Sequence, residues 1–139
     1  MIKYLVAICL ALFGLNAAAQ TCPTVNEIKS QSLTDWKAYD SDDGAPLSSK
    51  RVAEIKKYID QFAMAEFTGD SKKTGAIHCY YRDSNGSSLE AYFSKNNFVP
   101  ENNKNYWYAV SGSMNCAAGF DKCQFKNAVA KNEIQVAAK

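Results

Sequence analysis

Four cysteines constrain the fold of this chain more than any other feature of its sequence. Cys22, Cys79, Cys116 and Cys123 follow an N-terminal apolar segment typical of a secretory signal peptide, and a fifth, Cys9, lies inside that segment. An even number of cysteines in an exported chain predicts two disulfides. No C-x-x-C spacing is present, and export favours oxidation over a zinc site. We therefore expect a small domain cross-linked at two places.

The N-terminal segment fixes the compartment. One early positive charge, Lys3, precedes an apolar run from Tyr4 to Leu15, and Ala17-Ala18-Ala19 follows as an A-x-A cleavage site. The run is about 12 residues, too short for a bilayer that needs roughly 20 helical residues. We predict a signal peptide over residues 1–19 and a single mature domain over residues 20–139, with no membrane span.

The charge of the mature chain is close to balance. Loss of Lys3 with the signal peptide lowers the net charge from +2 to about +1. Basic residues are scattered in short pairs such as Lys56-Lys57, which is typical of a solvated surface. The balance argues against nucleic acid and against a strongly acidic ligand as partners.

The disulfide pairing has three solutions, because four cysteines can be joined in three ways. Cys116 and Cys123 are seven residues apart with Gly119 between them, so a local bridge closes easily. Cys22 would then join Cys79 and tie the N-terminus to the body of the domain. The spacing favours this pairing and leaves the other two open.

Two helices are expected in the first half of the mature chain. A short one begins after Thr24, with Glu27 in the capping-box position. The main one is capped by Ser48 or Ser49, and its apolar positions recur at spacings of three and four: Val52, Ile55, Ile59 and Phe62. From Gln61 to Phe67 the pattern loosens, into either the end of this helix or the start of a strand. In the polar segment before it, Trp36 and Tyr39 are expected to anchor onto the core.

A β-hairpin follows Gly75, where the period changes to two. "AIHCYYR" and "SLEAYFS" flank the turn "DSNGS". A three-residue loop Ser84–Gly86, with Gly86 in the left-handed position, puts apolar residues on one face by pairing Ile77 with Phe93, Cys79 with Ala91 and Tyr81 with Leu89. The other face then carries His78, Tyr80 and Arg82 across from Tyr92, Glu90 and Ser88. A two-residue loop would mix polar and apolar residues on each face, so we choose the register that makes a core.

A third strand, "YWYAVSGSM", places Trp107 on a different face from Tyr106 and Tyr108. The disulfide loop "NCAAGFDKCQF" leads into one more short strand. The sequence thus predicts an α+β fold, in which one main amphipathic helix packs on a small antiparallel sheet of three to five strands reinforced by two disulfides.

No pattern in the sequence indicates catalysis, a metal or a cofactor. Neighbouring residues on a strand point to opposite faces, so His78 cannot act as a base for Cys79. The segment Asp40–Arg51 fails as a calcium-binding loop, because glycine and the final acid are out of position. We therefore expect a protein that is not an enzyme.

Aromatic residues crowd the predicted strands, and the outer face gathers the residue types that anchor protein interfaces. The predicted partner-binding residues are His78, Tyr80, Arg82, Glu90, Tyr92 and Trp107. The expected partner is a protein of the cell envelope, and the same face is compatible with a homodimer.

A family resemblance rests on four landmarks: "TCP", "IHCYYRD", "YWYAVSG" and "MNCAAGFDKCQF". Together they resemble a group of small periplasmic proteins of intracellular gammaproteobacteria that is associated with Dot/Icm-type (type IVB) secretion and called EirA-like. The resemblance implies a non-enzymatic periplasmic protein that supports the secretion system and growth inside host cells. Release from the cell rather than retention in the periplasm stays open.

The alternative function is that of a secreted inhibitor of a host hydrolase, either lysozyme or a protease. Inhibitors of that class insert a rigid loop into an active site, and the disulfide loop 116–123 is the candidate loop.

Overall fold

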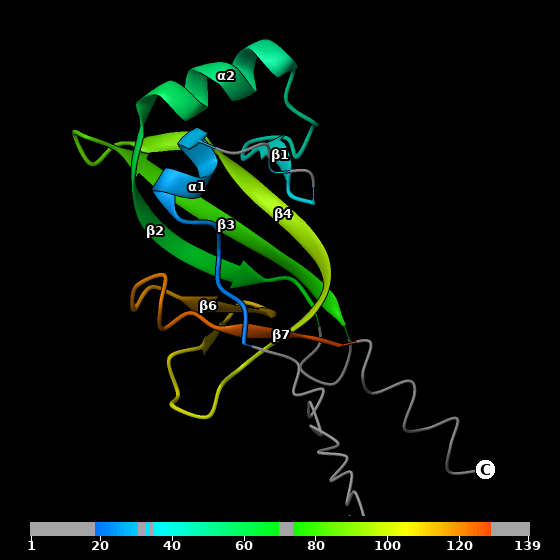
Figure 1. The fold of residues 1–139 in the computed structure, drawn as a ribbon. Helices are drawn as coiled ribbons and strands as arrows, with labels where there is room; N and C mark the ends of the chain where they lie inside the picture. Colours follow the sequence, from blue (N-terminus) through cyan, green and yellow to red (C-terminus); the bar gives the residue numbers. More distant parts are fainter. Residues whose placement is uncertain (1–18, 31–32, 34, 70–73, 129–139) are drawn as a thin grey trace, which may run out of the picture.

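The computed structural model describes residues 19–30, 33, 35–69 and 74–128. Within these residues the main unit is a seven-stranded antiparallel β-sheet with two short helices (Figure 1). The prediction of one main amphipathic helix on a sheet of three to five strands is therefore wrong, because strands dominate the described chain. The predicted signal peptide, apart from Ala19, lies outside the described residues.

The strands are β1 (Lys37–Asp40), β2 (Ile59–Phe67), β3 (Gly75–Asp83), β4 (Ser88–Pro100), β5 (Tyr108–Val110), β6 (Ser113–Cys116) and β7 (Phe125–Asn127). Their order in the sheet is β1-β4-β3-β2-β6-β5, and β7 pairs with the far end of β4. The three long strands β2, β3 and β4 form the centre, where each pairs with the next strand along the chain, and β1 and β6 add to this unit from remote parts of the sequence.

The first helix, α1 (Val25–Ser30), lies against the inner side of the central strands (Figure 1). The Thr24 hydroxyl accepts a hydrogen bond from the Glu27 amide at 3.1 Å, and the Thr24 amide donates to the Glu27 carboxylate at 3.3 Å. The predicted capping box is confirmed, and it satisfies amides that a helix start would otherwise leave unpaired.

The second helix, α2 (Ser49–Tyr58), lies across one end of the long strands (Figure 1). The Ser48 hydroxyl caps it by accepting from the Arg51 amide at 3.2 Å. The helix is shorter than predicted, because the chain passes directly into β2 at Ile59. Ile59 and Phe62 therefore belong to a strand, where they pair with β3. The spacing of three that joins them fits a helix, but a β-branched residue such as Ile59 also suits a strand.

The β3–β4 hairpin has the predicted turn. Gly86 adopts a φ of 80°, and the Asp83 carboxylate accepts the amides of Asn85 and Ser87, each at 2.9 Å. A residue with a β-carbon is strained at that φ, which explains the glycine.

The register of the same hairpin shifts beyond the turn. Arg82 pairs with Ser88 as predicted, but Tyr80 pairs with Tyr92 because β4 carries two extra residues in a bulge around Glu90, which has a φ of 55°. Cys79 consequently faces Phe93 rather than Ala91. A shift of two residues keeps every side chain on its predicted face.

The inner face of the sheet is the core. Ala65, Phe67, Ile77, Cys79 and Phe93 are buried there, and Ile28 of α1 is buried in the same cluster. Burial of one such isoleucine or phenylalanine contributes about 1.5–3 kcal/mol.

The disulfides join Cys22 to Cys79 and Cys116 to Cys123, so the favoured pairing is confirmed. The Tyr81 hydroxyl donates to the carbonyl of Pro23, next to the first disulfide. The segment that leads into α1 is thus fastened to β3 both covalently and by a buried hydrogen bond.

The predicted third strand is instead a hairpin of β5 and β6, with its turn at Ser111 and Gly112, whose φ values are 43° and 87°. Trp107 precedes β5 and is buried at 3% exposure. Its indole nitrogen donates to the Gln124 carbonyl at 2.9 Å. The expectation that Trp107 lies on the outer face is therefore wrong.

Candidate functional site

The outer face of the sheet lies opposite α1, because His78 and Tyr80 alternate along β3 with the buried Cys79 and Tyr81. Strand pairing aligns Tyr80 with Tyr92 of β4, and Tyr92 with Tyr39 of β1. In the neighbouring row it aligns His78 with Glu66 of β2. We call Tyr39, Glu66, His78, Tyr80 and Tyr92 the outer aromatic cluster.

The rings of this cluster contact one another. His78 stacks on Tyr92 with centroids 4.3 Å apart, and Tyr39 stacks with Tyr92 at 5.6 Å. Tyr80 leans against Tyr92 at 5.5 Å and a tilt of 44°. Contacts of this kind fix the rotamers of all four side chains before any partner arrives.

The Glu66 carboxylate is the polar centre of the cluster. Its Oε1 lies 3.4 Å from His78 Nδ1 and accepts from the Tyr80 hydroxyl at 3.4 Å. The side chains of His78 and Glu66 keep 18% and 26% of their surface exposed, so solvent or a partner can reach both.

Burial lowers the pKa of His78, although the nearby Glu66 carboxylate opposes that shift. Burial also raises the pKa of Tyr80, with Glu66 and Tyr92 adding to the effect. The imidazole is consequently neutral at pH 7. If its Nδ1 donates to Glu66, its Nε2 is left as a hydrogen-bond acceptor.

Two side chains near the cluster carry a thiol or hydroxyl that a histidine–carboxylate pair could in principle activate. Cys79 points to the opposite face and is in a disulfide. The Tyr80 hydroxyl is directed to Glu66 rather than to His78.

The structure brings together three of the six predicted partner-binding residues. His78, Tyr80 and Tyr92 meet in the cluster. Arg82 and Glu90 are exposed nearer the turn of the hairpin, where among the described residues they make no ion pair or ring contact with the cluster. Trp107 lies in the core.

Sequence reasoning missed two members of the cluster. Glu66 falls in the segment whose helical or strand character the pattern left open, and Tyr39 was expected to anchor onto the core. The alternation of "AMAEF" with buried Ala65 and Phe67 is the signal that places Glu66 outward. Tyr39 could be placed only through its pairing with Tyr92, which is remote in the sequence.

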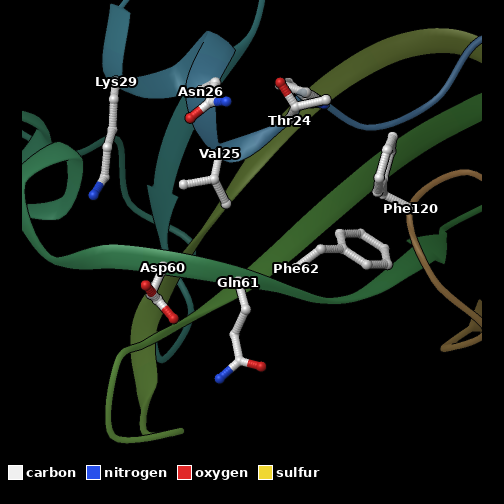
Figure 2. Close-up of a pocket in the computed structure, with 9 residues that line it drawn as sticks. Thr24, Val25, Asn26, Lys29, Asp60, Gln61, Phe62 and Phe120 are labelled. Atoms are coloured by element: carbon white, nitrogen blue, oxygen red, sulfur yellow. The ribbon is translucent and has the colours of Figure 1, made fainter.

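A pocket of about 560 Å³ lies elsewhere, where α1 meets the beginning of β2 (Figure 2). Val25, Phe62 and Phe120 give it an apolar part, and Lys29 and Asp60 stand toward its other end. Phe120 comes from the disulfide loop, lies across from Phe62 in Figure 2, and is 41% exposed. The volume falls within the range of ligand-binding pockets.

These features define a small exported protein, because two disulfides form and persist in an oxidising environment. No described helix has the length and hydropathy needed to cross a membrane. The chain belongs to DUF3757, a family of proteins of unknown function, whose model matches residues 17–126. Comparison with curated proteins and with solved structures gave no match.

Proposed function

We propose that this protein is a non-enzymatic binding protein of the periplasm that recognises a partner protein of the cell envelope through the outer aromatic cluster. The observation that carries the proposal is the stack of Tyr39, Tyr92 and His78 on a sheet face that no described helix covers.

The cluster has the properties of an interface anchor. Tyrosine rings offer large contact areas with few rotatable bonds, and these rings are already held in place, so little side-chain entropy is lost on binding. Glu66 supplies a partly exposed carboxylate beside them. A donor brought by the partner, such as a backbone amide or a basic side chain, complements this surface.

The resemblance of four sequence landmarks to periplasmic proteins associated with type IVB secretion suggests the partner's identity. On that basis we propose that the partner is a component of the secretion machinery, and that loss of the interaction impairs growth inside host cells. A homodimer formed through the same face is the competing form of this proposal.

The experiment compares partners recovered from the native cell envelope with tagged wild-type protein and with the variant Tyr92→Ala. We expect a specific envelope protein to be recovered by the wild type and lost with Tyr92→Ala. Tyr58→Ala is the matched control, because Tyr58 is 58% exposed on α2 and outside the cluster. Recovery of the same partner by Tyr92→Ala, with near-UV circular dichroism unchanged, would remove the cluster as the interface. Light scattering of the purified protein tests the homodimer.

One observation favours a second function, that of a hydrolase inhibitor. Phe120 is exposed on a loop that the disulfide Cys116–Cys123 closes over seven residues. Such a loop is rigid enough to enter an active site. Lysozyme and protease assays with purified protein test this function, and inhibition that Phe120→Ala abolishes would support it.

A further inference from the structure

The strand β2 has an unpaired edge over the first two-thirds of its length. β3 pairs with one side of β2 from Ile59 to Phe67, with bulges between Ile59 and Gln61 and between Phe62 and Met64. On the other side, β6 pairs only with Ala65, Glu66 and Phe67. In the described part of the chain, no strand pairs with residues 59–64 on that side. Asp60 and Gln61 are exposed there. An edge of this kind offers free backbone donors and acceptors to another extended chain.

The pocket of Figure 2 lies along this edge. Its lining includes three consecutive residues of β2, Asp60, Gln61 and Phe62. A bulge between Ile59 and Gln61 breaks the strict alternation of side chains here. Together the three residues border the pocket along the side of β2 that no described strand covers. The opposite wall is formed by α1 and by Phe120.

The two ends of the pocket differ in chemistry. At one end, Phe62 and Phe120 stand across from each other (Figure 2), and no ring contact joins them in the described structure. At the other end are Lys29 and Asp60, and within the described residues no ion pair joins these two side chains. The aromatic end has room for an apolar side chain, and Lys29 is available to a carboxylate.

We propose that this pocket binds an extended peptide segment of a partner protein, which adds to the free edge of β2 as a short antiparallel strand. Main-chain hydrogen bonds to residues 60–62 supply the part of the affinity that does not depend on the peptide's sequence. The contacts of its side chains with the pocket supply the specificity, as in other proteins that bind peptides by strand addition.

The direction of the peptide follows from the sheet. An antiparallel strand that continues the line of β6 runs from the Phe62 end of the pocket toward the Asp60 end. A large apolar side chain therefore enters between Phe62 and Phe120, and two residues later, on the same face, an acidic side chain meets Lys29. Asp60 disfavours a second acid, so the segment carries one acid rather than an acidic run.

The test is a titration of ¹⁵N-labelled protein with the blocked peptide acetyl-Gly-Phe-Thr-Glu-Gly-amide, followed by amide chemical shifts. We expect the shift changes to centre on residues 60–62 and on Phe120. Replacing the probe's phenylalanine by alanine should weaken binding about tenfold, because the lost phenyl burial corresponds to roughly one decade of affinity. Replacing its glutamate by lysine should weaken binding about two- to fivefold, as for an exposed ion pair.

Variants of the protein complete the test. Phe120→Ala should reproduce the loss seen with the alanine probe, and Lys29→Glu should make the protein prefer the lysine probe over the glutamate probe. Tyr58→Ala, which removes an exposed aromatic ring outside the pocket, should leave binding unchanged. The proposal is overturned by equal binding of the phenylalanine and alanine probes, by wild-type affinity in Phe120→Ala, or by no shift change at roughly millimolar probe. Shift changes confined to His78 and Tyr92 would assign the peptide to the outer aromatic cluster and also overturn it.

Discussion

The two disulfides should differ in their contribution to stability, because they close loops of very different length. Cys22 and Cys79 are separated by 57 residues, whereas Cys116 and Cys123 are separated by 7. If a disulfide acts mainly by restricting the unfolded chain, the longer loop contributes about 4.2 kcal/mol and the shorter about 2.4 kcal/mol. The difference is about 1.8 kcal/mol in the free energy of unfolding.

The perturbation is the paired replacement Cys22→Ala with Cys79→Ala, compared with Cys116→Ala with Cys123→Ala. All four cysteines are buried at 1% exposure or less, so each pair loses a similar buried volume. The cost of the lost sulfur atoms therefore largely cancels when the two variants are compared. What remains is the difference in loop entropy.

The assay is urea unfolding at neutral pH, followed by circular dichroism and tryptophan fluorescence, with the free energy extrapolated to water. We expect the variant without Cys22–Cys79 to be the less stable of the two by about 1.8 kcal/mol. Equal stability of the two variants, or lower stability of the variant without Cys116–Cys123, would refute the loop-entropy explanation. It would show that local restraint of the loop after β6 matters more than the constraint on the unfolded chain.

Four further predictions use the same measurement. Tyr81→Phe should cost about 1–3 kcal/mol, because the buried Pro23 carbonyl loses its donor. Burial raises the pKa of Tyr81, so the folded protein keeps a proton that the unfolded chain releases above about pH 10. The free energy of unfolding should therefore fall as the pH rises past that value, and it should fall less steeply in Tyr81→Phe. Burial lowers the pKa of His78, so the unfolded chain binds a proton before the folded protein does as the pH falls below about 6.5. The free energy of unfolding should therefore fall as the pH drops below that value, and the fall should be smaller in His78→Asn. Gly86→Ala should cost about 1–2 kcal/mol from its positive φ alone, since an added β-carbon meets nothing within 4 Å; a larger loss would contradict this account of the turn.

The sequence predicted the β3–β4 hairpin well, because one face of it is core. Alternation of Ile77, Cys79 and Tyr81 with polar neighbours admits only one assignment of faces, and the turn residues fix where the strands reverse. The bulge around Glu90 could not be predicted, because two extra residues leave the alternation of inward and outward side chains along β4 unchanged.

The boundary between α2 and β2 could not be predicted from the sequence pattern, for a different reason. Ile55, Ile59 and Phe62 have helical spacing, and only the pairing of β2 with β3 decides that the last two extend the sheet. The same pairing brings Glu66 to His78, so one of the five members of the outer aromatic cluster depended on a strand that the pattern did not resolve. Trp107 was misplaced because a run of three aromatic residues carries no alternation of polarity from which to choose its face.

The pairing of Gln20 with Phe125 has a consequence for export. The Gln20 amide donates to the Phe125 carbonyl at 2.8 Å, and the Phe125 amide donates back at 2.9 Å. Gln20 is the first residue after the predicted cleavage site, and Phe125 begins the last described strand. This bridge therefore cannot form until Phe125 has been synthesised and lies on the same side of the membrane as Gln20. It is among the last contacts of the described domain that can form, and in an exported chain it forms where the disulfides also form.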